Sequence, residues 1–180
     1  MQKKKKTRSL TTYLKYRDEM KSGDLLLFSP DSYLGGVIEW RTGYDITHIG
    51  FLFRHEFIDN HVLSLEALEN GICFNRLSRR ISNYEGQIYW LPLKEDYDCY
   101  RNDLSKIAFL CSFSKFPIGT LVSNFISPTI VDYQKMLCSE YCYYPYMLNN
   151  MVVWRRKMPY PGEFEKLDIF KNRVLITNDD

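Results

Sequence analysis

The segment ITHIGFLF, residues 46–53, predicts a β-strand and decides the class of fold. It is rich in β-branched and aromatic residues, which favour strands. Because side chains alternate across a strand, His48 and Gly50 stand on the same face. Ile46 and Leu52 share that face, and Thr47, Ile49, Phe51 and Phe53 form the other. A polar, open position therefore sits on an otherwise apolar strand.

The segments around this strand predict an antiparallel meander. Short apolar runs at residues 24–28, 61–68, 71–76 and 86–93 predict further strands, and the pair Asn70-Gly71 favours a hairpin turn. Helical spacing predicts helices at 10–21, with Thr11 or Thr12 as the cap, at 102–114 and at 137–148. Residues 33–42 predict a short helix or loop, and residues 169–177 an edge strand. We therefore predict an α+β fold, a small antiparallel sheet or half-barrel packed against helices.

Composition predicts one globular domain. The 180 residues are 45% hydrophobic and 16% aromatic, which favours a packed core and argues against general disorder. No apolar run approaches the roughly 20 residues of a membrane-spanning helix, and no apolar segment of a secretory signal follows the basic start. Five cysteines without such a signal indicate reduced thiols. We expect a cytoplasmic protein, peripheral to a membrane if it meets one.

Charge is distributed unevenly along the chain. The first ten residues hold five of the 24 basic residues (Lys3, Lys4, Lys5, Lys6 and Arg8) and no acid, so the rest of the chain holds 19 basic and 22 acidic residues. A nucleic-acid-binding domain carries its basic charge on the folded surface, so we expect no specific nucleic-acid binding. We predict a disordered basic arm at residues 1–9 before a domain at residues 10–180. An anionic membrane is one partner for this arm, and a solvated flexible end is the alternative.

Two predicted strands place a histidine near a carboxylate. In residues 61–68, Ser64 and Glu66 share a face. If this strand pairs with residues 46–53, His48 and Glu66 meet on one surface, where a carboxylate fixes the tautomer of an imidazole and stabilises its protonated form. Gly50 would keep that surface open.

The stretch MLCSEYCYYPY, residues 136–146, supplies a candidate nucleophile. If a helix begins at Cys138 and its N-terminus docks against the sheet, the helix and a protonated His48 both favour the thiolate. The Cys138 amide N–H could then hold an oxyanion. Glu140 would oppose the thiolate unless its side chain points away.

Other interpretations of these residues stay open. A histidine beside a carboxylate can be a satisfied core pair, and Cys138 with Cys142 at i, i+4 can be two core thiols. The chain lacks the CxxC and HxxxH sets typical of metal sites, so we predict no metal ion and no cofactor.

Several motifs occur in a particular order: GDLLLF (23–28), Thr47-His48-Ile49-Gly50, Leu65-Glu66-Ala67, Asn70-Gly71-Ile72 and Leu137-Cys138-Ser139-Glu140, with weaker echoes in GTLVSNF (119–125) and Pro161-Gly162-Glu163-Phe164. This order resembles the circularly permuted branch of the NlpC-type papain-like superfamily, the YiiX-like cysteine amidases and peptidases, which are related to lecithin:retinol acyltransferase-like enzymes. The resemblance covers about residues 22–165 and implies a permuted papain-like fold. It also implies that Cys138 is the nucleophile, His48 the base and Glu66 the orienting residue.

The resemblance predicts a cysteine hydrolase that cleaves amide bonds, with cell-wall peptides as the leading substrate. Lipid acyltransferase, phospholipase or thioesterase chemistry on amide or ester lipids is the alternative on the same fold. A catalytically silent papain-like domain used for binding is the alternative from another class. Oligomeric state is not predicted by any of these motifs.

Overall fold

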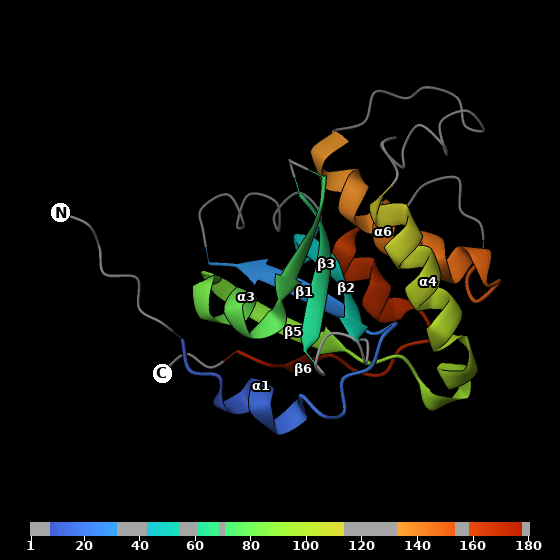
Figure 1. The fold of residues 1–180 in the computed structure, drawn as a ribbon. Coiled ribbons are helices and arrows are strands. Elements are labelled where there is room, and N and C mark those ends of the chain that lie inside the picture. Colours follow the sequence, from blue (N-terminus) through green and yellow to red (C-terminus); the bar gives the residue numbers. More distant parts are fainter. Residues whose placement is uncertain are drawn as a thin grey trace.

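The computed structural model describes residues 8–31, 43–54, 61–68, 71–113, 133–153 and 159–177. A six-stranded antiparallel sheet has the order β4-β3-β2-β1-β5-β6 (Figure 1). Its strands are β1 (Leu25–Pro30), β2 (His48–Arg54), β3 (Val62–Leu68), β4 (Gly71–Arg76), β5 (Gly86–Leu91) and β6 (Val174–Leu175). The helices are α1 (Thr11–Tyr16), α3 (Leu77–Asn83), α4 (Arg101–Ser112) and α6 (Tyr133–Leu148), with 3-10 turns η2 (Glu95–Tyr100) and η3 (Pro161–Lys166). These elements form an α+β fold.

Helices cover both faces of the sheet, so the strands have two apolar sides. On one face α4 and α6 pack over side chains such as Leu27, Phe51 and Leu65. On the other face α1 and α3 pack over Leu26, Leu52 and neighbouring apolar side chains. The central strands β1 and β2 are therefore nearly continuous apolar runs, as expected of strands buried on both sides. A polar side chain pointing from them needs a partner or an opening.

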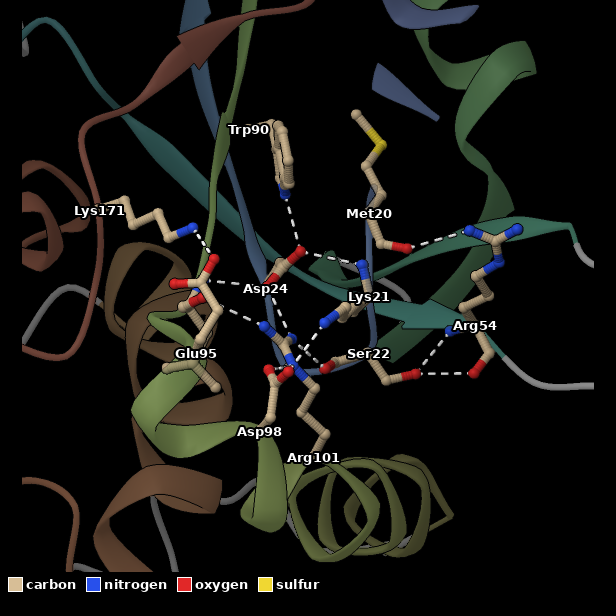
Figure 2. A network of polar contacts seen from close by, with 12 residues as sticks. Met20, Lys21, Ser22, Asp24, Arg54, Trp90, Glu95, Asp98, Arg101 and Lys171 are labelled. Carbon is tan, nitrogen blue, oxygen red and sulfur yellow. Dashed lines mark hydrogen bonds and ion pairs between the residues drawn. The ribbon is translucent and has the colours of Figure 1, made fainter. Parts of the chain in front are cut away.

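A buried polar network fixes the start of β1 (Figure 2). The carboxylate of Asp24 is 1% exposed and accepts hydrogen bonds from the Trp90 indole at 2.8 Å, the Leu93 amide at 3.0 Å and the Arg101 guanidinium at 2.8 Å. The preceding residue, Gly23, has φ +86°, a left-handed conformation that favours glycine. Burial raises the pKa of Asp24, and the Arg101 charge works against that rise. The GD of the GDLLLF motif thus ties β1, β5 and α4 together.

Most predicted elements are present, with corrected ends. The strand at 71–76 has the predicted limits, and the edge strand near the C-terminus exists as the short β6. The first helix ends at Tyr16 rather than residue 21, and neither Thr11 nor Thr12 caps it, because Leu10 is the N-cap and makes no side-chain capping bond. Helix α3 was not predicted. The segment 33–42 and the turn residue Asn70 lie outside the described residues.

Within the described ranges, no helix is long and apolar enough to cross a membrane.

Candidate active site

His48 and Glu66 meet on the face of the sheet that α3 covers. Nε2 of His48 lies 3.1 Å from Oε2 of Glu66. Gly50 lies between them on the same face, and a Cβ atom added there would stand 3.0 Å from Cγ of Glu66 and 3.4 Å from the Phe28 ring. Because Gly50 has no side chain, the Glu66 side chain can pass over it to reach the imidazole.

The pairing of β2 and β3 stops short of the site. The register runs from Arg54↔Val62 to Phe51↔Leu65, although both strands continue beyond it. The Leu52 amide donates at 2.9 Å to the carbonyl of Asp24, directly before β1, so amides of the alternate set, including that of Ile49, point toward β3. The Ile49 N–H hydrogen-bonds the Cys138 sulfur instead of a β3 carbonyl. Cys138 of α6 therefore lies at the end of β2 that is not paired with β3.

Tyrosine hydroxyls pin α6 at this place. The Tyr141 hydroxyl donates to the Ala108 carbonyl of α4 at 2.9 Å, and the Tyr146 hydroxyl donates to the Gly23 carbonyl at 2.7 Å. Both rings are fully buried in the core between the helices and the sheet. Cys138 lies at the edge of the same core and is 2% exposed. Helix position therefore fixes the sulfur, because a cysteine side chain has only one torsion with which to adjust.

The Cys138 thiol and the His48 imidazole are hydrogen-bonded to each other. Burial favours the neutral thiol, but the hydrogen bond and charge of His48, with the Ile49 and Ser139 amides, lower the pKa of Cys138 below its ordinary value. Burial likewise opposes charge on His48, yet its bonds to Cys138 and Glu66 raise its pKa to about 9. Both shifts favour the ion pair of a Cys138 thiolate and a His48 imidazolium. Since Nε2 faces Glu66, Nδ1 is the nitrogen available to the sulfur.

The predicted position of Cys138 at the start of a helix is wrong. Helix α6 begins at Tyr133, so Cys138 is its sixth residue. Only the first four amides of a helix lack partners within it, so the Cys138 N–H is used inside α6 and is not available to an oxyanion. Glu140, two positions on, projects from nearly the opposite side of the helix, since successive side chains turn by about 100°. Its charge therefore does not face the sulfur.

Two polar residues at the site were not anticipated, and both bind Glu66. The Ser64 hydroxyl donates to Oε1, and Arg80 of α3 donates from Nε to Oε1 at 3.0 Å and from Nη2 to Oε2 at 3.0 Å. Burial favours a neutral Glu66, but its bonds to His48 and Arg80 lower its pKa to about 2. Leu77 and Ile81 form the buried stripe of α3, and Arg80 stands beside it. The i, i+4 spacing of Leu77 and Ile81 in LSRRISN is the sequence feature that indicates this short helix.

The first described residue, Arg8, lies near this end of the sheet. The Arg8 guanidinium donates to the Gly86 carbonyl, and Gly86 pairs with Pro30 at the same end of β1 that places Phe28 opposite His48. Lys3, Lys4, Lys5 and Lys6, which precede Arg8, lie outside the described residues.

Comparison with known proteins identifies the fold. The chain matches no protein-family model and no curated protein. Among solved structures it is similar to the metalloprotein yiiX from Escherichia coli O157:H7, with 18% sequence identity and a TM-score of 0.51. The alignment covers 71% of this chain and 65% of yiiX, so the chain spans just under two thirds of that protein's length. The architecture is therefore the α+β fold of yiiX.

Proposed function

We propose that this protein is a cysteine hydrolase that cleaves amide bonds through Cys138, His48 and Glu66 and forms a thioacyl-enzyme intermediate. The observation that carries the proposal is a buried thiol hydrogen-bonded to an imidazole, which a fully buried carboxylate holds from the other side at 3.1 Å. The three residues come from α6, β2 and β3. A thiolate–imidazolium pair is the resting state of an activated cysteine nucleophile.

Each residue has a distinct task in the proposed reaction. The Cys138 thiolate attacks the carbonyl carbon and forms a tetrahedral intermediate. His48 donates its proton to the leaving amine as the carbon–nitrogen bond breaks, which leaves a thioester. His48 then takes a proton from water, the resulting hydroxide attacks the thioester, and the carboxylic acid leaves as the thiolate reforms. Glu66 keeps its charge throughout and holds the imidazole in one tautomer.

The substrate class comes from the sequence resemblance, which favours peptide bonds of the cell-wall type. Amide and ester bonds of lipids suit the same three residues, because the chemistry acts on a carbonyl in both cases. Parallel assays on peptidoglycan fragments and on acylated lipids therefore decide between the two. Release of product from neither class by an intact, thiolate-bearing protein would favour a binding role.

A metal ion has no evident place in this arrangement. The name metalloprotein is given to yiiX, but among the residues described in this chain no group of three or more His, Cys, Asp or Glu side chains could hold a metal ion. The oxygens of Glu66 are bonded by His48, Arg80 and Ser64. We therefore route no step through a metal.

Thiol labelling tests the proposal without a known substrate. At pH 6, iodoacetamide should modify Cys138 faster than the other four cysteines, because the pKa of Cys138 is lowered by its bond to His48. Cys99 is exposed and serves as the internal reference thiol. Labelling of Cys138 no faster than that of Cys99 would remove the activated nucleophile. Hydrolysis that survives the change Cys138→Ala would remove the catalytic assignment.

A further inference from the structure

Arg80 is a charged residue of the site that has no role in the proposed reaction. It makes three hydrogen bonds to the Glu66 carboxylate, at 3.0, 3.1 and 3.0 Å. Its guanidinium lies 5.0 Å from the Phe28 ring centroid and 4.8 Å from that of Tyr84. Two aromatic rings and a bidentate carboxylate thus fix it in one plane, a geometry that lysine cannot reproduce.

The Phe28 ring connects Arg80 to the histidine as well. Its centroid lies 5.2 Å from that of His48, so one side chain of β1 contacts both cations that flank Glu66. Nη2 of Arg80 and Nε2 of His48 each approach Oε2 of Glu66 within 3.1 Å, which places the two nitrogens no more than about 6 Å apart. A single carboxylate oxygen therefore sits between two positive groups.

This arrangement balances the charges of the site. With Cys138 as the thiolate of the proposed reaction, Cys138 and Glu66 are negative while His48 and Arg80 are positive, so the four groups sum to zero. Without Arg80, the full charge of Glu66 would act on His48 alone and hold its proton more tightly. A histidine that holds its proton too tightly is a poor acid toward the leaving amine.

We propose that Arg80 is a positioning residue of the active site: through Glu66 it orients His48 and moderates how strongly His48 holds its proton. The inference rests on the proposed function, because it concerns the same histidine. The hydrogen bonds of Arg80 described at this site go to the Glu66 carboxylate, so its effect on His48 runs mainly through that carboxylate. Among the described residues, the charged or titratable groups around this site are Glu66 on β3, His48 on β2, Cys138 and Cys142 on α6, Tyr84 after α3 and, next to Tyr84, Arg8.

The test follows the alkylation rate of Cys138 by iodoacetamide as a function of pH, in the full-length protein, with Cys138 quantified by mass spectrometry. In Arg80→Gln, Glu66 loses the cation that shares its charge, so that charge acts on His48 alone. Both midpoints of the profile, that of the thiol and that of the imidazole, should rise by about one pH unit. Arg79→Gln is the matched control, because Arg79 is the adjacent, exposed arginine of the same helix, and it should leave both midpoints in place.

A double variant shows whether Arg80 acts through Glu66. In a Glu66→Gln background, the change Arg80→Gln should move the midpoints by less than in the wild type, since the carboxylate that links the two cations is gone and only their direct repulsion remains. Equal shifts in both backgrounds would overturn the inference. So would a loss of thermal stability in Arg80→Gln with unmoved midpoints, because Arg80 would then only brace α3 against the sheet.

Arg80→Lys decides the question if Arg80→Gln does not fold. The charge is kept, so the midpoints should stay within a few tenths of a pH unit, while hydrolysis of p-nitrophenyl acetate should slow about tenfold as the bidentate contact is lost. An unchanged rate would overturn the inference. Failure of the proposed function is recognised separately, because the wild-type protein would then show no thiol that reacts at low pH.

Discussion

Replacing Gly50 by alanine tests how the site is built, since this glycine is the passage through which Glu66 reaches His48. The backbone at Gly50 does not have a positive φ, so alanine meets no conformational penalty there. The new methyl group would stand 3.0 Å from Cγ of Glu66, 3.4 Å from Cε2 of Phe28 and 3.4 Å from the Leu65 carbonyl oxygen. These neighbours belong to β1 and β3, so the methyl group is confined from both sides.

The expected cost is moderate because two effects oppose each other. Overpacking of a closely packed site costs about 1–3 kcal/mol, and the lower entropy of the unfolded alanine chain offsets about 0.4–1 kcal/mol of that. Gly50→Ala should therefore lower the free energy of unfolding by about 0.5–2 kcal/mol. The Glu66 side chain must shift by a few tenths of an ångström, which lengthens its bond to His48. We expect alkylation of Cys138 at pH 6 to slow about three- to tenfold as the thiol pKa rises.

The assay combines urea unfolding with the alkylation rate at pH 6. Glu66→Ala removes the atom that the new methyl group would strike, so in that background Gly50→Ala should cost little or stabilise the protein. An equal cost in both backgrounds would show that the methyl group strains something other than the carboxylate. Alkylation at the wild-type rate in the single variant would refute the view that Gly50 is kept small for Glu66.

The remaining predictions concern pH, the buried network and the arm. The pKa of Glu66 is lowered from 4.5 to about 2, so the stabilisation that it contributes is present above about pH 4.5 and is lost as pH falls toward 2. The pKa of His48 is raised from 6.5 to about 9, so its contribution is complete below pH 6.5 and is lost as pH rises through 9. The melting temperature should therefore be highest between about pH 4.5 and 6.5. In Glu66→Gln the fall in melting temperature below pH 4.5 should disappear, and a fall that persists in this variant would be due to other carboxylates. Asp24→Ala leaves the Trp90 indole and the Leu93 amide without their buried acceptor, although the half-buried Arg101 keeps its ion pair with Asp98, and it should cost about 3–5 kcal/mol in urea unfolding. A loss below 1 kcal/mol would contradict the role of the network in Figure 2. Deleting residues 1–7 should weaken binding to anionic vesicles at low salt without changing Cys138 alkylation; unchanged vesicle binding would leave the basic residues without that role.

Periodicity along single strands predicted the half of the site that depends on local geometry. Alternation placed His48, Gly50 and Glu66 on one surface, because side-chain direction in a strand follows from the backbone alone. It could not show that the space beside Gly50 is filled by Glu66 itself. That depends on the distance between neighbouring strands and on the length of one side chain, neither of which appears in the pattern.

The errors concern the two helices nearest the site. Asp132, a residue type favoured at helix N-caps, stands directly before Tyr133, so the sequence held a signal for the start of α6 that the prediction of a start near residue 137 did not use. Helix α3 has only seven residues, too few for helical spacing to stand out between two strands, and Arg80 was missed with it. Which side chain binds a buried carboxylate depends on tertiary structure. The direction of an arginine side chain in a predicted loop cannot be derived from the sequence pattern.

The three proposed catalytic residues meet because the sheet is incomplete at one point. His48 projects toward the side that α3 covers, whereas Cys138 arrives on α6 from the other side, so a continuous ladder would separate them with a layer of backbone. The β2–β3 pairing stops at Phe51↔Leu65; in the same register, two more positions would set Ile49 opposite Ala67 and engage the amide that now bonds the sulfur. His48 is the first residue of β2, and its imidazole is 20% exposed, so it stands at the rim where both sides are within reach. Cysteine and histidine can therefore come from opposite sides of the sheet and still share a proton, provided that the pairing of the two strands stops three residues before their ends.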